Sequence, residues 1–141
     1  MLFTLFRLKD QAELVTLKPG AGTDFFSKTW AYATPESPAY VEKCLKLHPS
    51  AGVIVDGKIV SGVLVMTEGF IGMLYTLDEA RGKGYAKATM HSVMKSLADQ
   101  RFIPACIVES RNLSSAALQR RIGFKEGPTV HMLYCKKPSF D

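Results

Sequence analysis

The chain has 141 residues and a formal net charge of +5, with 47% hydrophobic and 22% charged residues. This size and composition indicate one compact domain over residues 1–141, and no apolar run reaches the length of a membrane-spanning helix. The positive charge would attract either nucleic acid or a polyanionic small ligand. The basic residues are scattered and lack interleaved aromatic residues, so the sequence disfavours nucleic acid as the partner.

The cysteines and the N-terminus bear on the compartment. Cys44, Cys106 and Cys135 show neither C-x-x-C spacing nor a histidine at metal-ligand distance, which predicts reduced thiols and no metal site. The apolar start of the chain is interrupted by Arg7 too early for a signal peptide, and Asp10 disfavours a presequence. We therefore expect an intracellular, cytoplasmic protein; a mitochondrial location stays open.

The N-terminal third is expected to hold a short strand and two helices. The strand covers residues 14–17. The first helix spans residues 23–33, with Thr23 as its N-cap and aromatic residues along its apolar side. The second helix has Ser37 at its N-cap, followed by a proline at the first helical position, and ends at residues 48–49.

The middle of the chain predicts strands. Asp56 and Gly57 separate two apolar runs and are a strong signal for a two-residue hairpin turn. The flanking strands are expected at residues 52–55 and 58–66, and the next strand at residues 70–76.

The C-terminal part alternates between helix and strand. A long helix is predicted to follow residue 84, since apolar residues recur there at steps of three and four. An apolar strand is expected at 105–108, a short helix after Asn112, and a closing strand around residues 129–135. The resulting order, β-α-α-β-β-β-α-β-α-β, indicates an α/β (α+β) fold.

A basic, glycine-rich turn joins the strand at 70–76 to the long helix. Backbone N–H groups at a helix start lack intrahelical partners and attract anions. Gly82 and Gly84 let a phosphate approach closely, and Arg81 and Lys83 add positive charge. The spacing matches neither a Walker A loop nor a Rossmann fingerprint. A plain capped surface turn is the alternative interpretation.

The order Arg81-x-x-Gly84-x-Ala86 resembles the pyrophosphate-binding loop of the GNAT superfamily of acyl-CoA-dependent N-acyltransferases. The stretch from Asn112 to Phe124 is similar to that superfamily's second motif. The resemblance implies a mixed central sheet with helices on both faces, in which the parallel strands at 70–76 and 105–108 splay apart around the pantetheine arm.

The resemblance further implies acetyl-CoA or another acyl-CoA as donor and a small primary amine as acceptor. The sequence leaves open whether the protein is a monomer or a homodimer. The residues expected to bind the cofactor are Leu74, Tyr75, Thr76, Arg81, Gly82, Lys83, Gly84, Tyr85, Ala86, Asn112 and Ser115. Backbone groups of residues 74–76 are expected to be unpaired in the sheet and to bind the peptide-like arm.

The catalytic groups that the resemblance implies are few. Glu68 is the candidate base, with an exposed turn carboxylate as the alternative interpretation, and the Leu74 N–H is the candidate oxyanion donor. Gln119 stands where many GNAT enzymes have a tyrosine acid, and a carboxamide cannot deliver a proton. The departing thiolate is therefore expected to be protonated by water, by another side chain such as Ser115, or not by a dedicated group.

Three short strings narrow the resemblance to the C-terminal domain of glycine N-acyltransferase-like proteins. They lie at residues 48–53, 76–79 and 102–104. Members of that group acylate glycine or other small amino acids, so an amino acid is the expected acceptor. A protein or peptide N-terminus, or a non-catalytic CoA-binding module, are the alternatives. The acyl chain length is not indicated.

Overall fold

The computed structural model describes residues 11–133. The strands are β1 (Glu13–Val15), β2 (Ser50–Val55), β3 (Lys58–Val65) and β4 (Ile71–Thr76). The helices are α1 (Ala21–Thr29), α2 (Ser37–Leu47), α3 (Tyr85–Asp99) and α4 (Leu113–Ile122), and a short 3-10 turn covers Asp78–Ala80.

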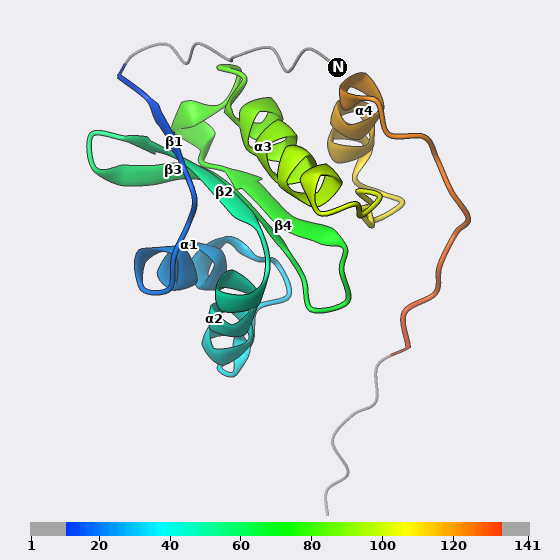
Figure 1. The fold of residues 1–141 in the computed structure, drawn as a ribbon, viewed down its shortest axis with the longest axis horizontal. Helices are drawn as coiled ribbons and strands as arrows, with labels where there is room; N and C mark the ends of the chain where they lie inside the picture. Colours follow the sequence, from blue (N-terminus) through cyan, green and yellow to red (C-terminus); the bar gives the residue numbers. More distant parts are fainter. Residues whose placement is uncertain (1–10, 134–141) are drawn as a thin grey trace, which may run out of the picture.

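The strands form one sheet in the order β1-β2-β3-β4, and each neighbouring pair is antiparallel. A parallel bridge from Ile71 to Cys106 extends the sheet beyond β4, so the sheet is mixed. Helices α1 and α2 lie against one face, and α3 and α4 lie on the other (Figure 1). This confirms the predicted α/β architecture with helices on both faces.

The hairpin between β2 and β3 forms where the sequence predicts it. Asp56 and Gly57 both adopt positive φ angles, 49° and 76°, as a tight turn between twisted strands requires. Val55 and Lys58 pair directly across it. The turn therefore sets the register of the two central strands as far as the pair Ile54–Ile59, beyond which a bulge shifts the register.

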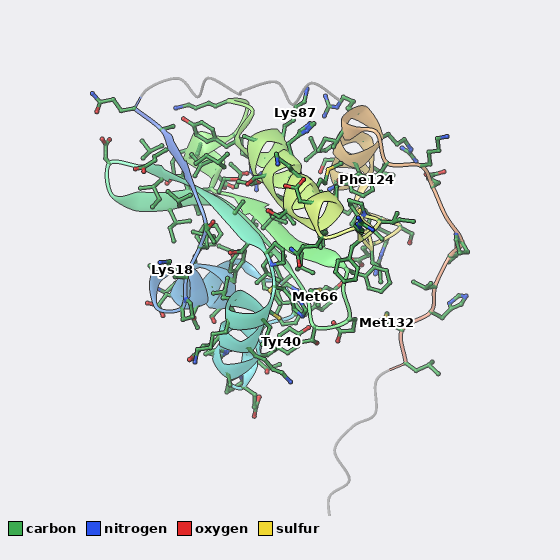
Figure 2. The ribbon with its side chains drawn as sticks, viewed as in Figure 1. Lys18, Tyr40, Met66, Lys87, Phe124 and Met132 are labelled. Carbon is green, nitrogen blue, oxygen red and sulfur yellow. The ribbon has the colours of Figure 1, made fainter. Side chains whose placement is uncertain are left out.

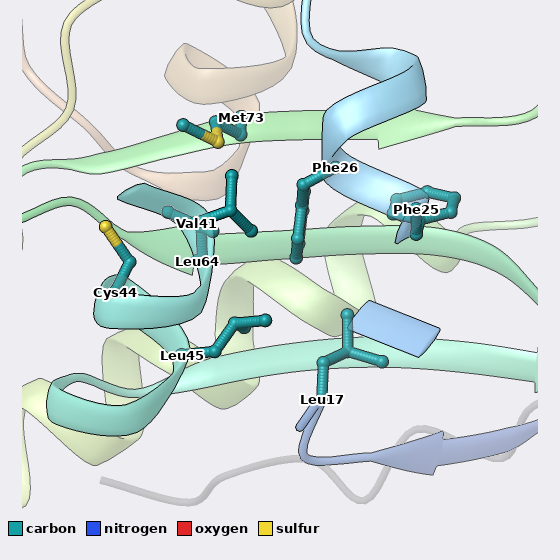
Figure 3. Packing of buried hydrophobic residues seen from close by; sticks show 8 residues of the cluster. All are labelled: Leu17, Phe25, Phe26, Val41, Cys44, Leu45, Leu64 and Met73. Atoms are coloured by element: carbon teal, nitrogen blue, oxygen red, sulfur yellow. The ribbon is translucent and has the colours of Figure 1, made fainter. Parts of the chain in front are cut away.

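The core under α1 and α2 is built from aromatic and aliphatic side chains of several elements. Phe26 of α1, Val41 and Cys44 of α2, and Leu64 of β3 are fully buried. Figure 3 shows these side chains with their neighbours between the two helices and the sheet. Burying one such apolar side chain contributes about 1.5–3 kcal/mol, so this cluster holds both helices to the sheet.

The opposite face is covered by α3, as its periodic apolar residues predict. Met90 and Val93 are fully buried against Ala51 and Val63 of the sheet. Ile122 and Phe124, at the end of α4, pack at the margin of this cluster. The long helix is therefore confirmed, and it fixes the position of its N-terminus beside β4.

The predicted N-caps of two helices are wrong, by three residues for α1 and by one residue for α2. Helix α1 begins at Ala21, with Gly20 as its N-cap, and Thr23 accepts a hydrogen bond from the Gly20 N–H at 3.3 Å. Helix α2 has Glu36 as its N-cap. Ser37 lies inside the helix, where its hydroxyl accepts from the Thr34 N–H at 2.7 Å. In both cases the predicted hydroxyl does accept a hydrogen bond from a backbone N–H near the helix start, but its residue lies inside the helix and is not the N-cap.

The two predicted C-terminal strands are also wrong in the described residues. Residues 105–108 form only the bridge at Cys106. Residues 129–133 carry no strand and run out from the body after α4, where Figure 2 labels Met132. A segment with alternating apolar residues forms a strand only when a neighbouring strand pairs with it. Here β4 separates from residues 105–108 after a single bridge, so no ladder forms. Residues 134–135 lie outside the described range.

Within residues 11–133, no helix is long and apolar enough to cross a membrane.

Gly62 of β3 lies where the aromatic residues of α1 come closest to the sheet. A Cβ added there would lie 2.9 Å from Phe25 Cε1 and 3.2 Å from Phe26 Cζ. We expect Gly62→Ala to lower the free energy of unfolding by about 1–3 kcal/mol, because overpacking forces neighbours out of place. Urea denaturation measures this. Gly127→Ala, whose Cβ meets nothing within 4 Å, is the matched control, and equal effects of both variants would contradict the packing argument.

Candidate active site

Strand β4 contains a bulge. Gly62 pairs with Tyr75 and Leu64 pairs with Gly72, so Met73 and Leu74 together face the single residue Val63. Met73 has a φ of 57°, in the left-handed region that non-glycine residues rarely adopt. One residue is thus inserted into β4, and the strand bends at this point.

The bulge changes which face of the sheet each side chain meets. Ile71 packs in the cluster under α3, whereas Met73, two residues later, packs in the cluster under α1 and α2. In a regular strand these two residues would share one face. Leu74 then returns to the α3 side, and Tyr75 packs on the α1 and α2 side.

A cleft opens beside the bulge. The Ile71 N–H donates to the Ala105 carbonyl at 2.8 Å, and beyond that point β4 and residues 106–109 separate. The space between them has a volume of about 340 Å³. Its lining comes from residues 29–32, 71–75 and 106–109, and from Met90, Asn112, Ser115 and Gln119. The predicted splay between these two segments is therefore present, although only one of them is a strand.

Gln119 of α4 presents an unusual group to this cleft. Its side chain is only 6% exposed, and its Oε1 has no hydrogen-bond partner among the described residues. A buried carbonyl without a partner costs about 1–3 kcal/mol. Such an orphaned acceptor in a cleft wall fits a ligand that carries an N–H or O–H group.

The glycine-rich turn has the geometry of an anion site. Gly82 and Gly84 have φ angles of 75° and 81°, and Gly84 is the N-cap of α3. An added Cβ at either glycine would meet nothing within 4 Å, so the turn is open in front of the helix start. The first N–H groups of α3 lack partners by helix geometry and carry partial positive charge. Lys83 is exposed next to them.

Arg81 is partly engaged within its own loop. Its Nε donates to the Thr76 carbonyl at 3.2 Å, and its Nη2 lies 3.0 Å from Asp78 Oδ1. Its guanidinium also lies 5.7 Å from the centre of the Tyr75 ring. These contacts fix the loop to the end of β4. They also limit one expected contact: the Thr76 carbonyl already accepts one hydrogen bond from Arg81, which leaves its second lone pair for a ligand.

Two other predicted cofactor contacts are restricted by their local partners. The Tyr85 side chain is 2% exposed and lies in the core, so only its backbone faces the loop. Asn112 lines the cleft, but its Oδ1 already accepts from the Ser115 N–H at 3.1 Å and from the Ser114 hydroxyl at 3.2 Å. The amide nitrogen of Asn112 is the group that this capping leaves for a ligand.

Glu68 lies in the exposed turn between β3 and β4 and is not part of the cleft lining. The Tyr40 hydroxyl donates to its Oε2 at 3.0 Å, and Figure 2 labels Tyr40 on α2, with Met66 just after β3. Burial raises the pKa of Glu68. Hydrogen bonds from its own backbone and from the hydroxyls of Tyr40 and Thr67 outweigh burial, so the net pKa lies below the ordinary value. The carboxylate is therefore ionised at neutral pH.

Sequence reasoning missed the residues on the far wall of the cleft. Trp30, Tyr32 and Glu109 line it, and the Tyr32 hydroxyl donates to Glu109 Oε2 at 2.9 Å. Tyr32 and Glu109 are 77 positions apart, and neither belongs to a motif. No signal in the sequence pairs them, because the contact depends on how the α1–α2 connection folds over the sheet.

Comparisons with known proteins agree with the fold. The model of a family described as FR47-like protein matches residues 53–132. No curated protein matches the sequence. A solved Drosophila protein is 20% identical with a TM-score of 0.77, and the match covers 85% of this chain and 41% of that one. This chain thus spans about two fifths of the Drosophila protein.

Two smaller solved proteins match over nearly their whole length. An aminoglycoside N-acetyltransferase in complex with CoA is 16% identical with a TM-score of 0.76, and the match covers 95% of this chain and 100% of that one. A ribosomal-protein-alanine N-acetyltransferase from Brucella melitensis is 18% identical with a TM-score of 0.66, covering 89% of this chain and 99% of that one. At these identities the matches establish a shared fold.

The orphaned carboxamide yields a prediction about stability. Gln119→Leu should raise the free energy of unfolding of the free protein by about 1 kcal/mol, because it removes a buried unpaired acceptor. Chemical denaturation without ligand measures the change. The matched control is Gln100→Leu, since Gln100 is exposed and its Nε2 donates to the Ser96 carbonyl. A destabilised Gln119→Leu variant would show that the carboxamide is satisfied in solution.

Proposed function

Since the chain belongs to the FR47-like family and shares its fold with GNAT acetyltransferases, we propose that it is an acyl-CoA-dependent N-acyltransferase. The observation that carries this proposal is the cleft between β4 and residues 106–109, opened by the bulge at residues 73–74. Strand β4 leads directly from this cleft into the anion-binding turn before α3.

The donor is acetyl-CoA or another acyl-CoA. Its phosphates bind at the N-terminus of α3, where Gly82, Lys83, Gly84 and Ala86 present backbone N–H groups and charge. Its neutral pantetheine arm lies in the cleft, along Leu74 and Tyr75 and across from Asn112 and Ser115. Arg81 acts mainly by holding the turn in place, in line with its contacts to Thr76 and Asp78.

The chemistry is direct transfer. The neutral nitrogen of the acceptor attacks the thioester carbon, the carbon–sulfur bond breaks, and CoA leaves as a thiolate that takes up a proton. Leu74 has no Cα partner on β3, and its N–H is the proposed donor to the oxyanion that forms. Gln119 can donate a hydrogen bond to the sulfur but cannot deliver the proton.

The acceptor is a small primary amine, with an amino acid first. This rests on the strings at residues 48–53, 76–79 and 102–104, which resemble glycine N-acyltransferase-like proteins. The name of the Brucella protein says that it acetylates a ribosomal protein, so a peptide N-terminus is the alternative acceptor. A non-catalytic CoA-binding module is the alternative to an enzyme. A single domain over residues 1–141, as a monomer or homodimer inside the cell, completes the proposal.

Glu68 is the proposed base. Its lowered pKa keeps it ionised at working pH. Because it does not line the cleft, a proton from the acceptor would reach it through intervening groups.

Cofactor binding is tested by thermal unfolding with acetyl-CoA, benzoyl-CoA and free CoA. At about one hundred times its Kd, a ligand adds about 2.7 kcal/mol of stability. Lys83→Ala should weaken this binding roughly three- to tenfold without changing the stability of the free protein. Lys46→Ala, on the opposite side of the sheet, is the control. The absence of any shift with all three ligands would end the proposal, and a shift without acyl transfer would favour the CoA-binding module.

The role of Glu68 is tested by Glu68→Gln. If Glu68 is the base, turnover falls at neutral pH in the variant. In the wild type, activity declines only as the pH drops through a Glu68 pKa below the ordinary value, since the ionised form is the active one. The pH dependence of kcat in both proteins measures this. Identical profiles would remove Glu68 from the mechanism.

A further inference from the structure

The cleft has a second, differently built end. There the α1–α2 connection contributes Trp30 and Tyr32, and the segment after the β4 bridge contributes Glu109. The hydrogen bond from the Tyr32 hydroxyl to Glu109 Oε2, at 2.9 Å, joins the two segments. This contact holds the carboxylate at the mouth of the cleft.

This end of the cleft differs from the rest of its lining because it carries a charged side chain. Among the described residues that line the cleft, Glu109 is the one that carries a formal charge at neutral pH. The Cys106 thiol is neutral because burial raises its pKa. Arg111, with which Glu109 forms an exposed ion pair at 3.5 Å, is not part of the lining. Within the lining, in a chain with a net charge of +5, the Glu109 carboxylate supplies negative charge that favours a cation.

Aromatic rings form the wall beside this carboxylate. The Trp30 ring stacks on Tyr40, with centroids 6.3 Å apart and planes at 19°. It meets Tyr32 edge-on, at 6.2 Å and 71°. The faces of such rings attract a nearby cation, and the rings pack against short carbon chains. Carboxylate and rings together match the chemistry of a primary ammonium group.

We propose that this end of the cleft binds the acceptor, with its ammonium group on Glu109 and its carbon atoms against Trp30 and Tyr32. The inference rests on the proposed transferase function and names the acceptor site within it. It also separates two carboxylates: Glu109 contacts the acceptor, whereas Glu68, outside the cleft, does not.

Arg111 narrows the acceptor to an α-amino acid. Its Nη2 lies 3.5 Å from Glu109 Oε1, and its side chain is exposed at the same mouth. An α-amino acid carries a carboxylate one carbon away from its ammonium group. When the ammonium group binds Glu109, that carboxylate comes within reach of the Arg111 guanidinium, which binds carboxylates well.

The test is steady-state kinetics at saturating acetyl-CoA, with release of free CoA followed by chromatography. Glycine, glycinamide and ethylamine serve as acceptors, because they carry the same primary amine with and without a carboxylate. We expect Glu109→Gln to raise the KM of glycine at least tenfold while the KM of acetyl-CoA stays within twofold. Glu42→Gln, an exposed carboxylate on α2 paired with Lys46, is the matched control and should change neither.

Arg111→Gln separates the amino acid from other amines. It should raise the KM of glycine at least fivefold and leave that of glycinamide unchanged. Equal effects on both acceptors would overturn the assignment of an α-amino acid. An unchanged glycine KM in Glu109→Gln would overturn the acceptor site itself, while transfer in the wild type would leave the transferase proposal standing.

Two further outcomes are also decisive. If acetyl-CoA stabilises the protein but none of the three amines accelerates CoA release, the acceptor inference fails and cofactor binding survives. If none of acetyl-CoA, benzoyl-CoA and free CoA gives a thermal shift, the proposed function fails first.

Discussion

The bulge in β4 is the feature on which the rest of the site depends. Two residues, Met73 and Leu74, face one residue on β3, so the strand bends and its side chains change faces. That bend separates β4 from residues 106–109 immediately after the Ile71 contact and leaves a cleft inside an otherwise paired sheet. The positive φ of Met73 is unfavourable by itself, and the packing of its side chain in the core under α1 and α2 stabilises it.

The charges are arranged along the direction that a CoA thioester would take. Positive charge and free N–H groups lie at the start of α3, neutral side chains line the middle of the cleft, and the carboxylate of Glu109 lies at its mouth. In the proposed complex, the polyanionic head of CoA, its neutral arm and the ammonium group of the acceptor would each meet the matching part. This order explains why the net charge of the chain alone indicated no partner: the relevant charges are local.

The sequence predicted what depends on local chemistry. The turn at Asp56 and Gly57, the apolar face of α3, and the short helix after Asn112 were all foreseen, because each follows from residues within one or two turns of chain. The edge of the sheet was not predicted correctly. Residues 105–108 and 129–133 have the composition of strands, but no neighbouring strand forms a hydrogen-bonded ladder with them. The bulge was not predicted either, because its positive φ falls on Met73 and not on the neighbouring Gly72. The contact between Tyr32 and Glu109 could not be foreseen, since it forms only after α1 and the sheet have packed.

Amide hydrogen–deuterium exchange with and without acetyl-CoA tests the central claim most directly. The account predicts slower exchange in residues 72–76, 82–86 and 106–109 when acetyl-CoA binds, and unchanged exchange in α2, which lies on the other face of the sheet. Protection of the turn at 82–86 alone would mean that the phosphates bind but the arm does not enter the cleft. Protection of none of these segments would contradict the account.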